Sequence, residues 1–163
     1  MKSETFKFNK IPENLDELKT LPEAALTSPF AVAALSVLVL CNYENNRDKT
    51  IVMLNYLKGP QPLSVYETQF ICDRLSGKGY KTYSFFEGSS PQNSYTPVKP
   101  YTITVFDNPY SYDNAGYAKI YMRSSGADTE RYLSLRQKGD NWYVWEIFYL
   151  SDIRTPAKDD PWA

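Results

Sequence analysis

Apolar residues in the first half of the chain recur at intervals of three and four, the spacing of a helix with one buried face. These intervals predict about four helices, over residues 12–22, 28–43, 48–58 and 64–77. The second is apolar nearly all round, so we expect other elements to cover it on most sides. Gly59 and Pro60 end the third, because glycine tolerates the left-handed capping conformation and proline cannot continue a helix. Ser64 and Glu67 form the S-x-x-E capping box that opens the fourth.

The second half of the chain changes to a period of two, which is typical of strands with one buried face. Residues 80–86 fit a strand, and residues 87–100 form a long loop with prolines at 91, 97 and 100. Alternation then predicts four strands joined by turns, over residues 101–107, 117–124, 131–138 and 142–150. The last strand is apolar on both faces, so we expect it to be central or covered on both sides.

Helices followed by sequential strands with short turns favour an α+β fold, with about four N-terminal helices packed on a C-terminal four-stranded antiparallel meander. We expect a single domain over residues 1–163, divided into a helical half at 12–77, a sheet half at 80–150 and a turn-rich tail at 151–163. The predicted core consists of the apolar residues on the inward faces: Phe30, Leu35, Leu38, Leu54, Leu57, Phe70, Ile103, Val105, Ile120, Met122, Leu133, Leu135 and Val144.

Composition narrows the class of protein. The net charge is -1, so no basic field favours nucleic acid, and we expect no nucleic-acid partner. The most apolar run, residues 29–41, is shorter than the ~20 residues that cross a bilayer, and the chain begins without a secretory pattern. We therefore expect no membrane partner and a cytoplasmic location. Cys41 and Cys72 lie in different predicted helices, and we expect both to be buried, free thiols.

The chain contains no histidine, which removes histidine-activated nucleophiles and histidine-ligated metal sites. Two cysteines cannot build a four-cysteine zinc site, and the sequence has no glycine-rich phosphate loop and no G-x-S-x-G motif. We therefore expect no metal and no cofactor. These absences favour a non-enzymatic binding or interaction module over an enzyme. The alternative is a small enzyme, or a carrier of small molecules, with a pocket between the helices and the sheet.

Short motifs run through nearly the whole chain from about Thr5: Leu57–Ser64, Tyr95–Pro97, Asn108–Tyr112, Leu135–Lys138, Trp145–Glu146, Asp152–Arg154 and Asp160–Ala163. In combination they resemble an uncharacterised family of small bacterial proteins, classed as a domain of unknown function. The resemblance implies a bacterial origin and one intact domain, and it carries no activity, cofactor or catalytic residue. Separately, the hairpin over residues 138–146 is similar to the last hairpin of cone-shaped folds like nuclear transport factor 2, which place helices before a curved sheet.

Glu146 is the carboxylate best suited to catalysis, and the orientation of the last strand decides its role. If Val144, Phe148 and Leu150 face the core, Glu146 lies among them, and desolvation favours the protonated carboxyl that a general acid needs. In the opposite orientation the neighbouring aromatic residues and Ile147 face inward, and Glu146 is solvated or paired with an arginine.

Three further features each carry two interpretations. Aromatic residues concentrate over residues 80–121, where they form a stacking surface for a sugar or a base, or else cover a flank of the core. The turn Ser124–Gly126 resembles an anion-binding turn but lacks the helix that follows a phosphate loop. Trp162 is either a partner-binding residue of the tail or a staple tucked against the sheet.

The outward face of the predicted sheet is unusually basic. Residues 117–138 carry five basic residues against Asp128 and Glu130, a local charge of +3 in a chain of net -1. Such cations either pair with acidic residues of the tail (Asp152, Asp159, Asp160) or hold an anionic ligand or a protein partner with arginine forks and tyrosine faces. We therefore predict a binding surface made by outward residues of two neighbouring strands: Lys119, Tyr121, Arg123, Tyr132 and Arg136.

Overall fold

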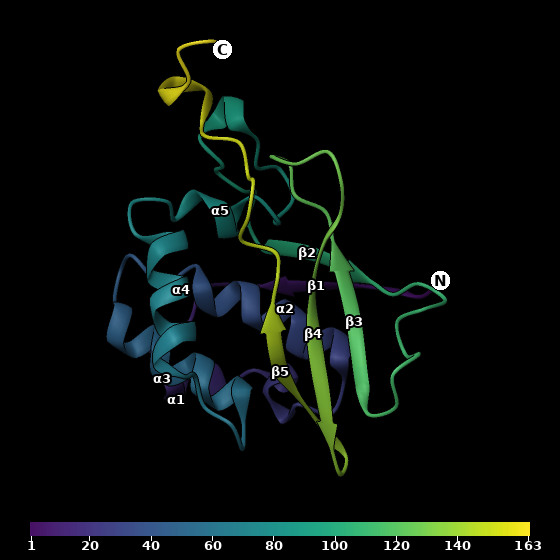
Figure 1. The fold of residues 1–163 in the computed structure, drawn as a ribbon. Coiled ribbons are helices and arrows are strands. Elements are labelled where there is room, and N and C mark those ends of the chain that lie inside the picture. The colour runs from purple at the N-terminus through teal and green to yellow at the C-terminus, as the bar shows by residue number, and fades with distance from the viewer.

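A computed structural model describes residues 1–163. It consists of one five-stranded sheet with the main helices on one side of it (Figure 1). In chain order the elements are β1 (Ser3–Phe8), α1 (Leu15–Lys19), a 3-10 turn η1 (Pro22–Ala25), α2 (Pro29–Leu40), α3 (Arg47–Lys58), α4 (Val65–Leu75), α5 (Tyr80–Tyr83), η2 (Pro91–Asn93), β2 (Tyr101–Phe106), β3 (Tyr117–Met122), β4 (Arg131–Lys138), β5 (Asn141–Ile147) and η3 (Ala157–Asp159).

The sheet order is β1-β2-β3-β4-β5, and every strand is antiparallel to its neighbour. The predicted α+β class and the antiparallel meander are confirmed, but the predicted four strands and four helices are not. The fifth strand, β1, pairs with β2 from Ser3 opposite Phe106 to Phe8 opposite Tyr101. Its alternation is short and carries only two apolar residues, Phe6 and Phe8, which is why the pattern did not reveal it.

In the segment 80–86, where a strand was expected, residues 80–83 are helical and residues 84–86 form a turn. The segment forms the short helix α5, and Ser84 N–H donates to Tyr80 O within it. A strand there would need a partner for its backbone groups, whereas one helical turn satisfies them locally. Helices α1 to α4 lie within residues 12–77 and strands β2 to β5 within residues 80–150, while β1 precedes the first helix.

Helix α2 forms the centre of the molecule. Ser28 caps it by accepting from Ala31 N–H at 3.3 Å, and every residue from Phe30 to Leu40 is buried. The helix contacts all five strands and α3, which explains its apolar character on every side. The predicted core residues are all buried except Phe70, which is only partly buried because α4 buries just Ile71 and Leu75. None of the helices is both long and apolar enough to cross a membrane.

A β-bulge in β5 decides which side chains face out. Leu135 pairs with Val144 and Ser134 pairs with Glu146, so Trp145 is the extra residue. The bulge shifts the alternation by one position. Glu146 is therefore exposed on the outer face. Of the two alternatives for Glu146, the one that places it among core residues is not found, and the carboxylate is solvated as in the other, although neither simple alternation holds along the whole strand.

The tail is fastened to the body as far as η3, which packs against η2. The Tyr95 hydroxyl donates to Arg154 O at 2.6 Å, and Arg154 N–H donates to Gly126 O at 2.9 Å. Beyond η3 the chain extends away from the sheet (Figure 1), and Trp162 is 92% exposed. The interpretation of Trp162 as a staple against the sheet is therefore wrong.

Candidate functional site

The candidate site is the face of the sheet opposite the helices, called here the outer face. All five predicted binding residues, from Lys119 to Arg136, lie on it, because residues at even spacing on a strand share a face. Tyr121 is directly opposite Tyr132, and Arg136 is directly opposite Tyr117. Lys119 is opposite Ser134. The structure thus brings residues from two strands onto one surface.

Four aromatic rings cross this face from β2 to the end of β5 and form what we call the aromatic ladder. The rings are Phe106, Tyr121, Tyr132 and Phe148, and their successive centroids are 6.1, 5.6 and 4.8 Å apart. The first and last pairs are stacked with interplanar angles of 24° and 25°. The middle pair is tilted at 36°, so the rings form a continuous row of neighbouring aromatic side chains. Each such pair stabilises the fold by about 0.5–1.5 kcal/mol, in addition to the contribution of the apolar area that it buries.

Cations lie over the rings of this face. Arg123 is 4.8 Å from the centroid of Phe106, and Lys119 is 5.6 Å from that of Tyr132. Arg136 lies over two rings at once, 5.3 Å from Tyr117 and 4.7 Å from Trp145. Sequence reasoning missed Phe106, Phe148 and Trp145 as members of this surface. The alternation of β3 could have added Tyr117, whereas Trp145 joins only through the bulge.

These three cations have no carboxylate partner. The four ion pairs of the protein lie elsewhere: Lys2–Glu4, Lys10–Glu17, Lys58–Glu67 and Arg154–Asp128. Of the basic residues in the segment 117–138, Arg131 alone reaches the tail, where it donates to Ser151 O and Asp152 O at 3.1 Å. Internal pairing of Arg123 and Arg136 with tail carboxylates is therefore wrong, because neither arginine belongs to an ion pair.

A hollow of about 450 Å³ lies on the outer face beside Arg136. The sheet contributes Lys119, Ser134 and Glu146, which are neighbours on β3, β4 and β5. The connection between β2 and β3 contributes Tyr110 and Asp113. An asparagine turn at the start of this connection, in which Asn108 Oδ1 accepts from Tyr110 N–H at 2.8 Å, holds it in place.

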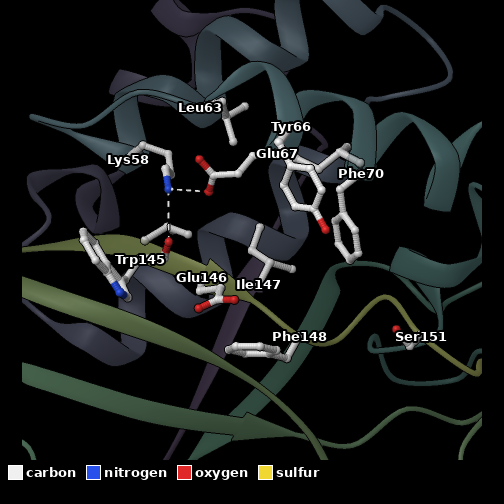
Figure 2. Close-up of a pocket in the computed structure, with 12 residues that line it drawn as sticks. Lys58, Leu63, Tyr66, Glu67, Phe70, Trp145, Glu146, Ile147, Phe148 and Ser151 are labelled. Atoms are coloured by element: carbon white, nitrogen blue, oxygen red, sulfur yellow. Dashed lines mark hydrogen bonds and ion pairs between the residues drawn. The ribbon is translucent and has the colours of Figure 1, made fainter.

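A second depression of about 260 Å³ lies between α4 and β5, and we call it the edge groove (Figure 2). Tyr66 and Phe70 of α4 face Ile147 and Phe148 across it (Figure 2). It is an open groove at the border of the sheet. Helix α2 fills the space between the helices and the centre of the sheet. The alternative prediction of a pocket between the helices and the sheet is therefore met only by this groove at the border.

A buried lysine closes one end of the edge groove. The Lys58 side chain is only 3% exposed, and its ammonium donates to Glu67 Oε2 at 2.9 Å and to Trp145 O at 3.0 Å (Figure 2). The Glu67 carboxylate also accepts from Ser64 N–H in the capping box at 3.0 Å. These bonds link the start of α4 to the bulge of β5.

Glu67 makes stability depend on pH. Partial burial acts to raise its pKa, but hydrogen bonds from the Ser64 backbone and the Lys58 ammonium outweigh burial, so the pKa lies below the ordinary 4.5. A carboxyl with a depressed pKa loses its contribution as pH falls from the ordinary value through the folded value. We expect the Tm of Glu67→Gln to fall less than that of the wild type between about pH 5 and pH 3. Glu130→Gln, at an exposed carboxylate, is the control, and an equal fall in all three proteins would contradict the role of Glu67.

Two other sequence-based interpretations are settled by the geometry. The Ser125 N–H donates to Ser84 O at 2.9 Å and the Gly126 N–H donates to Ser124 Oγ at 3.0 Å, so these donors are not free for an anion. An anion-binding turn at residues 124–126 is therefore wrong. Among the aromatic residues of the segment 80–121, several are buried and cover the core, including Phe85, Phe86 and Tyr95.

The comparison with known families agrees with the short motifs. A model of the family described as "Domain of unknown function (DUF6935)" matches residues 10–157. The chain belongs to this family. The DUF6935 match spans every element from α1 to β5 and excludes β1. No curated protein and no solved structure matches the chain, so the likeness to nuclear transport factor 2 stays a prediction. The DUF6935 description names no activity, and function has to be argued from the outer face itself.

Proposed function

We propose that this domain is a non-enzymatic binding module that holds an anionic partner on the outer face of its sheet. The observation that carries the proposal is the set of three cations, Lys119, Arg123 and Arg136, which lie over aromatic rings and have no carboxylate within ion-pair distance. Two unpaired cysteines support a reducing compartment, and the proposed setting is a bacterial cytoplasm. We treat the chain as a single domain.

The stacked arrangement suits anions better than sugars or bases. A guanidinium that lies over a ring keeps its N–H edge free for two parallel bonds to a carboxylate or phosphate. The ring also restricts the side chain, so less rotamer freedom is lost on binding. The rings of the ladder pack against one another and two of them lie under cations, so fewer ring faces are open for a base or sugar to stack upon.

The spacing of the cations favours an extended partner. Arg136 lies opposite Tyr117, and Arg123 is six positions further along β3. At ~3.3 Å per residue the backbone positions of the two arginines are roughly 20 Å apart along the sheet, with Lys119 between them. A single phosphate cannot reach both ends. An acidic polypeptide segment, with carboxylates spread along an extended chain, matches this line of charge.

The double substitution of Arg123→Ala with Arg136→Ala tests the proposal. With polyglutamate as the probe, we expect the variant to lose at least about tenfold in affinity, as for charged groups central to an interface. Its Tm should change little, because an exposed cation–π contact contributes only about 0.5–1 kcal/mol. Arg74→Ala is the matched control, since Arg74 lies 4.8 Å over Phe70 on α4, away from this face. The proposal is refuted if the wild type does not bind polyglutamate, or if the double variant binds it with the same affinity as the wild type.

The second candidate function is a carrier of a small apolar molecule in the edge groove. It is supported by the apolar side chains that line the groove, Leu63, Tyr66, Phe70 and Ile71 from the helical side. An apolar fluorescent dye that binds the wild type, and is released by Phe70→Ala but not by Arg123→Ala, would favour this function over the first.

A further inference from the structure

We infer that the acidic partner of the outer face is the segment Asp159–Trp162 of a second copy of this chain, with the indole of Trp162 seated in the hollow beside Arg136. The inference rests on the proposed function and names its partner. It joins two unpartnered features of one molecule: a projecting acidic segment that ends in an exposed tryptophan, and a face of unpaired cations around an aromatic hollow.

The projecting segment has the features of a ligand. Trp162 is 92% exposed, although tryptophan is a residue type that is highly buried on average. Asp159 and Asp160 belong to no ion pair. Trp162 N–H donates to Asp160 Oδ1 at 2.8 Å, so the aspartate and the indole are held in one local turn. Asp159 lies in η3, which packs against η2, and Figure 1 shows the last residues of the chain beyond it.

The hollow has the features of a receptor for an indole. Tyr117 and Trp145 supply apolar ring surface, and its volume of about 450 Å³ is in the range of pockets that hold small ligands. The carboxylates of Asp113 and Glu146 also line it. They are acceptors for the indole N–H, which is a donor only. They would repel an aspartate, so the hollow selects the indole rather than the carboxylates of the segment.

The charges around the hollow determine where the rest of the segment lies. Lys119 lines the hollow, and Arg136 lies over Trp145, which also lines it. Asp160 is two residues from Trp162, a reach of at most about 7 Å, so an indole in the hollow leaves this carboxylate near the two cations. The hydrogen bonds of Arg154 with Tyr95 and Gly126 hold the start of the tail against the body, so the exposed end lies beyond the sheet that carries the hollow.

The contact between two copies should be weak. A segment of a few residues buries less than the ~800 Å² per partner of a standard interface. Either two copies exchange segments reciprocally around a two-fold axis, or one contact is repeated head to tail. In both arrangements the mass measured in solution depends on protein concentration.

Sedimentation equilibrium of the full-length chain over a range of concentrations tests the inference. The wild type should self-associate, and both Trp162→Ala and the double variant Lys119→Ala with Arg136→Ala should weaken this by at least about tenfold. Mixing these two variants should restore association, because one supplies an intact face and the other an intact segment. Val65→Ala is the control, since it trims an apolar side chain that is 89% exposed at the start of α4 and lines neither depression.

Three results would overturn the inference: a monomeric wild type at every concentration, self-association that survives Trp162→Ala, or variants that do not complement each other. A monomer in which Trp162→Ala raises polyglutamate affinity shows that the segment covers its own face instead, which also overturns it. If polyglutamate binds and Arg123→Ala with Arg136→Ala abolishes this while the wild type is monomeric, the proposed function stands and the inference about the second copy fails. If the wild type neither self-associates nor binds polyglutamate, both the proposed function and the inference about the second copy are refuted.

Discussion

Replacing Gly59 with alanine is expected to destabilise the protein by about 3 kcal/mol or more, among the largest effects of a single added methyl group in this fold. Two costs combine. The backbone at Gly59 has φ 68° and ψ -125°, a conformation that residues with a Cβ rarely adopt. An added Cβ would also lie 2.2 to 2.7 Å from three ring carbons of Tyr143.

The surroundings of Gly59 give this contact little room to relax. Gly59 N–H donates to Asn55 O at 3.0 Å, and Asn55 Oδ1 accepts from Leu63 N–H at 2.8 Å, so the connection from α3 to α4 is fixed on both sides. Tyr143 is paired with Arg136 in the sheet. Moving the ring therefore disturbs β5, and moving the backbone disturbs the Lys58 contacts with Glu67 and Trp145.

Gly77→Ala separates the two costs. Gly77 has φ 72° but no atom lies within 4 Å of a Cβ added there, so its alanine variant should carry only the backbone cost of about 1 kcal/mol. The free energy of unfolding from urea titrations compares the two variants. An equal loss for both would show that the approach of Gly59 to Tyr143 contributes nothing.

The second large effect concerns the two thiols. In the native protein Cys72 should react with a thiol reagent at least about a thousandfold faster than Cys41, because a fully buried thiol is reached only when the structure opens. Cys41 is 8% exposed, and burial raises its pKa to about 12. Cys72 is half-buried on α4, and a hydrogen bond with the Ser76 hydroxyl holds its pKa below the usual value.

The reactive species is the thiolate, so exposure and pKa act in the same direction. Mass spectrometry at successive times should show one label added quickly and a second only after denaturation, and Cys72→Ser should remove the fast label. Both cysteines are free, as the sequence indicated, but the expectation that both are buried is wrong for Cys72. Fast labelling of Cys41 in native Cys72→Ser protein would contradict the packing described for the end of α2.

Much of the local structure could be predicted from the sequence because it depends on neighbouring residues. The capping box of Ser64 and Glu67 forms as expected and opens α4. Gly59 ends α3 with a positive φ, and Pro29 begins α2 behind the Ser28 cap. Alternation along two strands was also enough to put the five predicted binding residues on one face, since side chains on a strand point to opposite sides in turn.

What the sequence could not decide depends on contacts between distant parts of the chain. β1 forms because β2 offers an unpaired edge a hundred residues away, and one extra residue at Trp145 turns Glu146 outward. The sequence by itself determined the positions of α2, α3 and α4, most of the core and which charges share a face, because these follow from local hydrogen bonds and periodicity. Only the tertiary structure decided that the tail leaves the sheet and that the outer cations lie over aromatic rings without carboxylate partners, because both depend on how separate elements pack.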